Sequence, residues 1–166
     1  FSSRRRELAV AMGADVVVDP AATTPWQSWR ETAGWRDPSR APALPPWIVG
    51  PAVRPAVVFE CVGVPGVLDQ IMAPAPRGTR IVVVGVCMEP DTIYPMLGIS
   101  KELSLQFVLG YTPGEFAATL GHIAEGRIDT TPLITGRVGV EGVADAFATL
   151  ASPERHAKIL VEPWRA

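Results

Sequence analysis

The stretch PAVVFECVGVPG, residues 55–66, decides the fold. Its apolar run shows no polar alternation and stops at Glu60, and a glycine follows at residue 63. Strands that are apolar on both faces are typical of parallel sheets covered by helices. In such sheets, ligands bind beyond the carboxyl ends of the strands. The stretch therefore predicts both a strand and the edge of the sheet where a ligand binds.

Two further apolar runs repeat this pattern downstream. The segments TRIVVVGVC, residues 79–87, and ELSLQFVLG, residues 102–110, have the composition of unalternated strands. Apolar residues between 67 and 72 stand at helical spacing. Residues 91–98 are expected to form a short extended piece with a turn. The alternation of strands and helices predicts an α/β fold, a partial Rossmann-type doubly wound parallel sheet.

The first twenty residues predict a helix followed by a short strand at residues 15–20. Ser2 or Ser3 is suited to cap the start of the helix, and Gly13 to end it. Residues 21–54 are rich in Pro, Trp, Ser and Arg. A helical turn is expected around residues 25–33. The rest of this stretch is interpreted as an irregular insertion, a variable surface loop in preference to a functional one.

The chain after residue 110 predicts a capped helix. Thr112 and Glu115 form the pattern of a capping box, with Pro113 at the first helical position. A buried stripe is expected on this helix at Phe116, Leu120 and Ile123. The remaining segments predict extended chain at 132–140, a helix at 141–151 and a final strand at 157–163.

Composition and charge exclude several classes of function. Of the 166 residues 48% are hydrophobic, and 15 basic residues face 17 acidic ones, a net charge of −2. This balance gives no electrostatic footprint for nucleic acid or an anionic membrane. No apolar run reaches the 18 residues or so of a membrane-spanning helix. Two cysteines argue against a disulfide scaffold and suit a reducing, cytoplasmic location.

Each of the three predicted strands carries a glycine where its apolar run breaks. Gly63, Gly85 and Gly110 leave the backbone open to an approaching ligand. Free backbone N–H and C=O groups suit a carboxamide, and neighbouring valines offer a flat apolar wall. The pattern fits a nicotinamide ring, although glycines that serve only tight turns explain it equally well.

Six segments of the chain, taken in order, resemble the C-terminal half of a zinc-type medium-chain alcohol dehydrogenase. These segments are RRELAVAMGADVVVDP, VVFECVGVPGVLDQIM, GTRIVVVGV, KELSLQFVLGYTPGEF, GRIDTTPLITGRVGVEGVADAFATL and AKILVEP. The resemblance covers nearly the whole chain except residues 21–54. It implies a nicotinamide-dependent oxidoreductase that passes hydride between an alcohol and NAD or NADP, with zinc polarising the alcohol oxygen. Residues 1–110 would then be part of the nucleotide-binding domain, and residues 111–166 would return to the catalytic domain.

The resemblance also implies which residues contact the cofactor. Ser2 and Arg5 match positions near the adenosine ribose or its phosphate. Lys158 lies near a position where some relatives place a basic residue against the pyrophosphate. The strand-end positions that would line the nicotinamide and its carboxamide are Cys61, Val62, Gly63, Val64, Val84, Gly85, Val86, Phe107, Val108 and Leu109.

The resemblance further implies a homo-oligomer, since the strand at 102–110 would pair two subunits. The family's glycine-rich phosphate loop and its zinc-bearing domain have no counterpart in this sequence. The expectation is therefore that zinc is held elsewhere in the full-length protein, and that this chain by itself is inactive and folds poorly.

The metal-binding residue types do not stand at ligand spacing. A catalytic zinc needs three protein ligands, and the chain offers two cysteines and two histidines. Cys61 and Cys87 are interpreted as buried structural residues. His122 is expected on the helix surface and His156 in a loop, so no catalytic or metal role is assigned to any residue. Glu60 is expected to hydrogen-bond a backbone or arginine partner within the protein.

Three alternatives stay open. The first is a zinc-free NADPH-dependent quinone or enone reductase of the same superfamily. The second is a non-catalytic binding or dimerisation module. The third is a different Rossmann-like enzyme, such as a methyltransferase. The substrate, a small alcohol or carbonyl compound, and the choice between NAD and NADP are not fixed by these residues.

Overall fold

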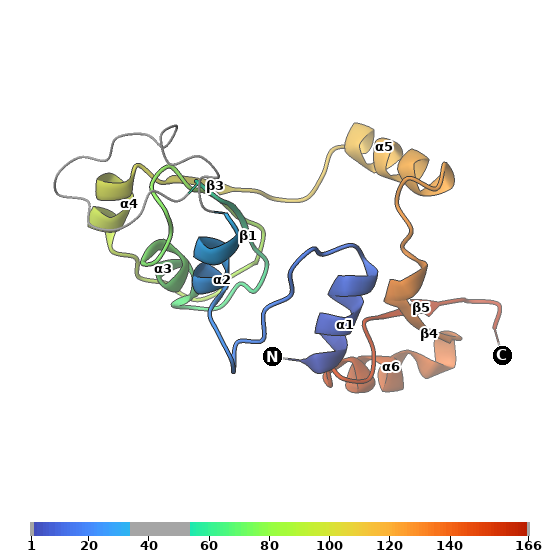
Figure 1. The fold of residues 1–166 in the computed structure, drawn as a ribbon. Helices are drawn as coiled ribbons and strands as arrows, with labels where there is room; N and C mark the ends of the chain where they lie inside the picture. The colour runs from blue at the N-terminus through green and yellow to red at the C-terminus, as the bar shows by residue number, and fades with distance from the viewer. Residues whose placement is uncertain (1, 34–53, 166) are drawn as a thin grey trace. The chain divides into compact units, whose positions relative to one another are not determined.

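The computed structural model describes residues 2–33 and 54–165, which fall in two compact units (Figure 1). The sheet unit comprises residues 25–110, and the C-terminal unit comprises residues 1–24 together with 111–166. The domain assignment expected from sequence keeps residues 1–24 with the nucleotide-binding part, and it stays a prediction.

The sheet unit is built on three parallel strands. Strands β1 (Val57–Glu60), β2 (Arg80–Val83) and β3 (Ser104–Phe107) follow one another in the order β1-β2-β3. Helix α3 (Val67–Met72) joins the first pair and helix α4 (Pro95–Lys101) the second. The parallel α/β architecture predicted from the apolar runs is confirmed, with strands shorter than the runs themselves.

The three strands also end at the same edge. The register pairs Glu60 with Val83 and Val83 with Phe107, so the last residue of each strand lies beside the last residue of its neighbour. Parallel strands in register bring their carboxyl ends to one edge of the sheet. The segments that follow the strands are therefore neighbours, as expected from sequence.

One face of this sheet is covered and the other is open. Ile81 on β2 is 0% exposed, and Met72 on α3 is 1% exposed. On β1, by contrast, Val57 and Phe59 are 46% and 65% exposed. Because successive strand residues point to opposite faces, these two residues share the open face. The unalternated run of β1 thus presents apolar side chains to solvent on one side.

The carboxyl end of α3 is closed by a lysine from α4. The Lys101 ammonium donates to the carbonyl oxygen of Met72 at 3.0 Å and also to that of Ala73. Burial, followed by the nearby charge of Arg30, lowers the pKa of Lys101. A cation at this end also interacts favourably with the negative end of the helix dipole.

The prediction of an extended piece at residues 91–98 is wrong for the second half of this range. Tyr94 is extended, but Pro95 takes the first position of α4 and the helix runs on to Lys101. A proline has its φ already fixed near the helical value and needs no intrahelical donor there. The helix ends at Glu102, whose φ of 51° is the left-handed conformation.

Helix α2 (Pro25–Thr32) confirms the helical turn expected around residues 25–33. The indole N–H of Trp29 donates to the Arg54 carbonyl oxygen at 3.0 Å, and Ala33 is buried. These contacts bring the two ends of the insertion together. The rest of the predicted insertion, residues 34–53, lies outside the described residues.

The C-terminal unit begins with α1 (Ser3–Ala11). The Ser2 hydroxyl accepts a hydrogen bond from the Arg5 N–H at 3.1 Å, which confirms the cap. Gly13 has a φ of 94°, as predicted for the residue that ends the helix.

The strand predicted at residues 15–20 is wrong, because this segment has no regular structure. A strand needs a hydrogen-bonding neighbour, and no strand among residues 2–33 and 54–165 pairs with it. The segment ends instead in a turn, where the Asp19 carboxylate accepts from the Ala21 N–H at 3.0 Å.

The rest of this unit follows the predicted order. Strands β4 and β5 pair in parallel, and α6 packs against β5. The elements after residue 110 are α5 (Pro113–Ala124), a 3₁₀ turn η2 (Thr131–Leu133), β4 (Ile134–Val138), a second 3₁₀ turn η3 (Val140–Gly142), α6 (Val143–Leu150) and β5 (Lys158–Val161).

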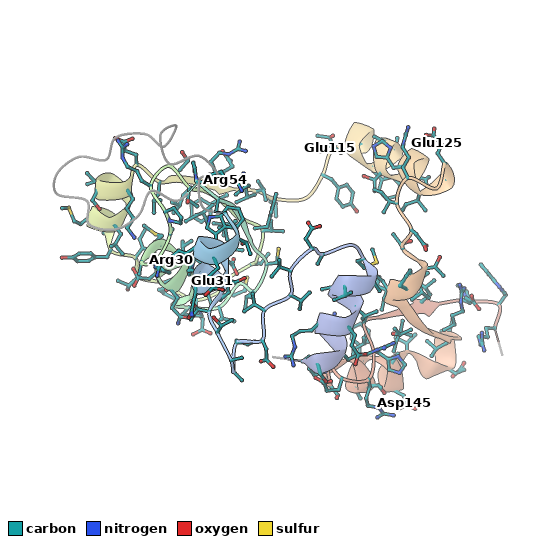
Figure 2. The ribbon with its side chains drawn as sticks, in the orientation of Figure 1. Arg30, Glu31, Arg54, Glu115, Glu125 and Asp145 are labelled. Atoms are coloured by element: carbon teal, nitrogen blue, oxygen red, sulfur yellow. The ribbon has the colours of Figure 1, made fainter. Side chains whose placement is uncertain are left out.

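Helix α5 has the predicted capping box but not the predicted burial. Thr112 and Glu115 exchange hydrogen bonds at the start of the helix. Figure 2 labels Glu115 at this end of α5. Phe116 and Leu120 are each 57% exposed, and Ile123 is exposed as well. The stripe has the right spacing, but the described residues supply no surface that covers it.

No helix in residues 2–33 and 54–165 combines the length and the apolar character needed to cross a membrane.

Candidate functional site

The predicted nicotinamide-side residues lie together at the carboxyl edge of the β1-β2-β3 sheet. We call this edge the strand-end rim, and it consists of residues 61–64, 84–86 and 107–109. The first two segments directly follow β1 and β2, and the third begins with the last residue of β3. The structure therefore brings ten of the thirteen predicted site residues into one part of the sheet unit.

Apolar side chains of the strand-end rim are exposed. Leu109 is 94% exposed and Val86 is 67% exposed, values typical of polar surface residues. Exposed apolar residues that gather in one place mark a surface that something covers. The exposed apolar residues of this rim are Val62, Val64, Val84, Val86, Phe107, Val108 and Leu109.

Two glycines let the first two rim segments touch backbone to backbone. A Cβ built on Gly63 would lie 2.5 Å from the Val86 nitrogen, and one on Gly85 would lie 2.4 Å from the Gly63 nitrogen. Gly63 also has a φ of 69°, where side chains are strained. Only glycine fits these positions, so the two segments can pack against each other backbone to backbone.

Glu60 forms hydrogen bonds with both of these segments. The residue is 5% exposed, and its Oε1 accepts from the Val62 N–H at 2.6 Å and from the Gly63 N–H at 2.9 Å. Its carbonyl oxygen accepts from the N–H groups of Val84 and Gly85, at 2.8 and 2.9 Å. The predicted backbone partner of Glu60 is confirmed, and the one residue binds both rim segments.

The prediction that both cysteines are buried is wrong for Cys61. Its side chain is exposed because the residue follows the end of β1 and stands beyond the packed part of the sheet. Cys87 is half-buried, and its thiol lies 3.4 Å from the Glu89 carbonyl oxygen. Both cysteines are free thiols.

The other three predicted site residues lie in the C-terminal unit. The Ser2 hydroxyl donates to the Pro153 carbonyl oxygen at 3.3 Å, and the Arg5 guanidinium donates to the His156 carbonyl oxygen at 3.2 Å. Lys158 opens β5 two residues further on. Both basic residues are therefore associated with the loop that leads into β5.

That loop also carries a residue that sequence reasoning missed. The Glu154 carboxylate accepts from the Arg4 N–H at 3.2 Å and from the Ser3 hydroxyl at 3.0 Å. Hydrogen bonds from the Ser2 side chain, the Arg4 backbone and Ser3 lower the pKa of Glu154. No local pattern pairs residues 150 positions apart, so only the fold reveals this contact.

The described residues do not fit a zinc ion. Residues 2–33 and 54–165 contain no group of three or more His, Cys, Asp or Glu side chains able to hold a metal. His122 is exposed on α5 and accepts from the Arg127 guanidinium at 2.9 Å. His156 lies in a loop with its Nδ1 3.2 Å from the Thr135 hydroxyl. Neither histidine belongs to a group of possible metal ligands within the described residues.

Comparison with protein families places most of the chain in a known group. Residues 1–125 match the model of the zinc-binding dehydrogenases. The chain is 30% identical over 109 residues to an (R,R)-butanediol dehydrogenase of Neisseria gonorrhoeae, which covers 64% of this chain and 30% of that protein. It is also 30% identical over 103 residues to an L-arabinitol 4-dehydrogenase of Penicillium rubens, covering 62% of this chain and 26% of that protein.

Solved structures give the same fold. The 2R,3R-butanediol dehydrogenase of Bacillus subtilis matches with a TM-score of 0.74 at 26% identity, over 98% of this chain and 42% of that one. A Sinorhizobium meliloti 1021 protein, determined bound to NADP, matches with a TM-score of 0.71 at 26% identity, over 98% of this chain and 44% of that one. The chain therefore spans less than half the length of these relatives.

Proposed function

Because the chain belongs to the zinc-binding dehydrogenase family, we propose that it is the cofactor-binding part of an oxidoreductase that transfers hydride between an alcohol and NAD or NADP. The observation that carries this proposal is the strand-end rim, where exposed apolar side chains lie at the ends of three parallel strands and two glycines bring the first two rim segments into backbone contact. The bound nicotinamide would supply the hydride acceptor or donor.

The strand-end rim would hold the nicotinamide by shape and by hydrogen bonds. Valines 62, 84 and 86 present apolar surface that suits one face of a planar ring and keeps water from it. Backbone groups beyond the ends of β2 and β3 would pair with the carboxamide. The apolar surface favours the ring, while the backbone pairing fixes its orientation.

We propose that Ser2, Arg5 and Lys158, all in the C-terminal unit, contact the ribose or phosphate groups of the cofactor. The positive charges of Arg5 and Lys158 suit phosphate groups. Ser2 lies beside Arg5 at the start of α1, where its hydroxyl pairs with the Arg5 N–H and the Pro153 carbonyl oxygen. We leave NAD and NADP as two outcomes of the binding experiment. The substrate would be a small alcohol or carbonyl compound, in keeping with the polyol dehydrogenases to which the chain is similar.

Cofactor titration of the natural polypeptide tests this proposal. NADH or NADPH should bind with a change in nicotinamide fluorescence, and Val86→Asp should weaken binding about tenfold or more. A carboxylate on the rim would lose its hydration when the ring covers it. Val140→Asp is the matched control, since Val140 is also well exposed, at 57% against 67% for Val86, but lies in the C-terminal unit. Equal affinity in the two variants would contradict the proposal.

The outer edge of β3 offers a further contact. This strand pairs only with β2 among the described strands, so its other edge has unpaired backbone groups. We propose that two copies pair through the predicted 102–110 segment into a homo-oligomer. Light scattering after gel filtration should then give a mass of at least twice that of one chain.

A cytoplasmic location stays a prediction from the sequence.

A further inference from the structure

We propose that Glu60 is a positioning residue for the nicotinamide, although it does not reach the cofactor itself. This inference rests on the function proposed above. Glu60 is a buried titratable residue to which hydride transfer assigns no part, and its position at the end of β1 raises the question of what its carboxylate does.

The carboxylate pairs with two backbone N–H groups of the turn that follows β1. Directly after β1 the chain leaves the sheet, so the N–H groups of Val62 and Gly63 lose the pairing that a strand would give them. Oε1 of Glu60 accepts from both, at 2.6 and 2.9 Å. A buried N–H group without an acceptor is costly, so this oxygen fixes the direction in which the turn leaves the strand.

The same residue also fixes the neighbouring turn. The Glu60 carbonyl oxygen accepts from Val84 and Gly85, which directly follow β2. A Cβ added at Gly85 would meet Oε2 of Glu60 at 2.7 Å, so the carboxylate lies against that glycine. Glu60 thus contacts both rim segments and sets the distance between them.

The proposed nicotinamide wall is made of those two segments. If they separate or shift, the backbone groups that pair with the carboxamide move away from the ring position. A displacement of this kind lowers cofactor affinity without removing any residue that contacts the cofactor. The prediction is therefore an effect on binding that exceeds the effect on folding.

The test compares three variants of the natural polypeptide. Glu60→Met keeps the length of the side chain and removes its acceptors, and it should weaken NADH or NADPH binding about tenfold. Glu60→Gln keeps one acceptor oxygen and should restore affinity to within about threefold of the parent. Binding is measured by fluorescence titration well below the melting temperature of each variant.

Thr79→Val is the matched control. Thr79 is 0% exposed, and its hydroxyl accepts from the Ala56 N–H at 3.3 Å at the opposite end of the same two strands. Its replacement removes a buried side-chain acceptor from the same sheet, so it should lower the melting temperature while leaving cofactor affinity unchanged. A purely structural role for Glu60 would make the two variants behave alike.

The outcomes separate the two proposals. If the parent binds neither NADH nor NADPH, the proposed function is wrong and this inference is wrong with it. If the parent binds and Glu60→Met binds equally well, or if Thr79→Val weakens binding as much, only the role of Glu60 is overturned. Should Glu60→Met fail to fold, Gly85→Ala displaces the same contact from the other side, and unchanged affinity in that variant also overturns it.

Discussion

At the residue scale, the rim depends on two glycines and one carboxylate that no single pattern in the sequence joins. Gly63 and Gly85 are 22 positions apart, yet each occupies the space that a Cβ on the other would need. The Glu60 carboxylate lies against Gly85 and accepts hydrogen bonds from the N–H groups of Val62 and Gly63. The rim therefore has almost no tolerance for added atoms at this point.

Gly85→Ala should destabilise the chain by about 1–3 kcal/mol, because a methyl group there forces backbone atoms apart. Gly98→Ala is the control in the same unit. A Cβ at Gly98 would meet only the Met72 methyl carbon, at 3.7 Å, and alanine is a better helix former than glycine. In urea unfolding, the free energy of unfolding should fall for Gly85→Ala and rise by up to about 1 kcal/mol for Gly98→Ala. Equal effects would show that the backbone contact adapts.

At the element scale, α5 shows how local signals specify a helix without specifying what it packs on. The capping box at Thr112 and Glu115 and the proline at the first position define its start. The apolar stripe has helical spacing, but Phe116 and Leu120 remain exposed. Local signals act within one turn of the chain, whereas burial needs a partner surface.

The capping box makes part of the stability of α5 depend on pH. Hydrogen bonds from the Thr112 backbone and then from its side chain lower the pKa of Glu115 below its usual value of 4.5. A carboxyl group whose pKa is lowered by folding stabilises the folded state above its unfolded pKa. This contribution is therefore complete above about pH 4.5 and is lost as the pH falls through the folded pKa.

Thr112→Ala should cost about 1 kcal/mol and move the pKa of Glu115 back toward its usual value. NMR titration of the Glu115 carboxyl group, together with urea unfolding, measures both effects. Thr119→Ala is the control, because Thr119 lies on the same helix and its hydroxyl donates to the Glu115 carbonyl oxygen at 2.8 Å, not to the carboxylate. An equal pKa change in the two variants would argue against the capping box as its cause.

At the scale of the whole molecule, the core is small for the length of the chain. Among the described residues, the buried apolar side chains are few, and several are alanines: Leu8, Ala33, Ala56, Met72, Ala75, Ile81 and Ala146. They divide between the two units. Of the large ones, Leu8 lies in the C-terminal unit, and Met72 and Ile81 lie in the sheet unit. Because each unit has its own buried side chains, we expect the chain to unfold in two steps.

Ile81→Ala should cost about 2–5 kcal/mol, since Ile81 is 0% exposed at the centre of the three-stranded sheet. Hydrogen exchange should become faster throughout residues 54–110, while β4 and β5 keep their protection. Ile99→Ala, at a position 74% exposed on α4, should change stability by no more than about 0.5 kcal/mol. Faster exchange in β4 and β5 as well would show that the two units unfold together.

The sequence alone determined the elements whose signals are local. The apolar runs predicted β1, β2 and β3 in order. The serine and glycine signals predicted the two ends of α1, the capping box predicted the start of α5, and the strand-end glycines indicated the edge where the strands end. These features depend on residues within one or two turns of each other, so they can be read from short windows.

The tertiary structure alone decided which side chains are covered and which groups meet. It left residues 15–20 without a strand partner among the described residues, and it left Cys61 and the stripe of α5 exposed. It also joined Gly63, Gly85 and Glu60 into one contact. Burial and backbone contact depend on surfaces that come from distant parts of the chain. Such surfaces exist only after the chain has folded, and for that reason no local pattern contains them.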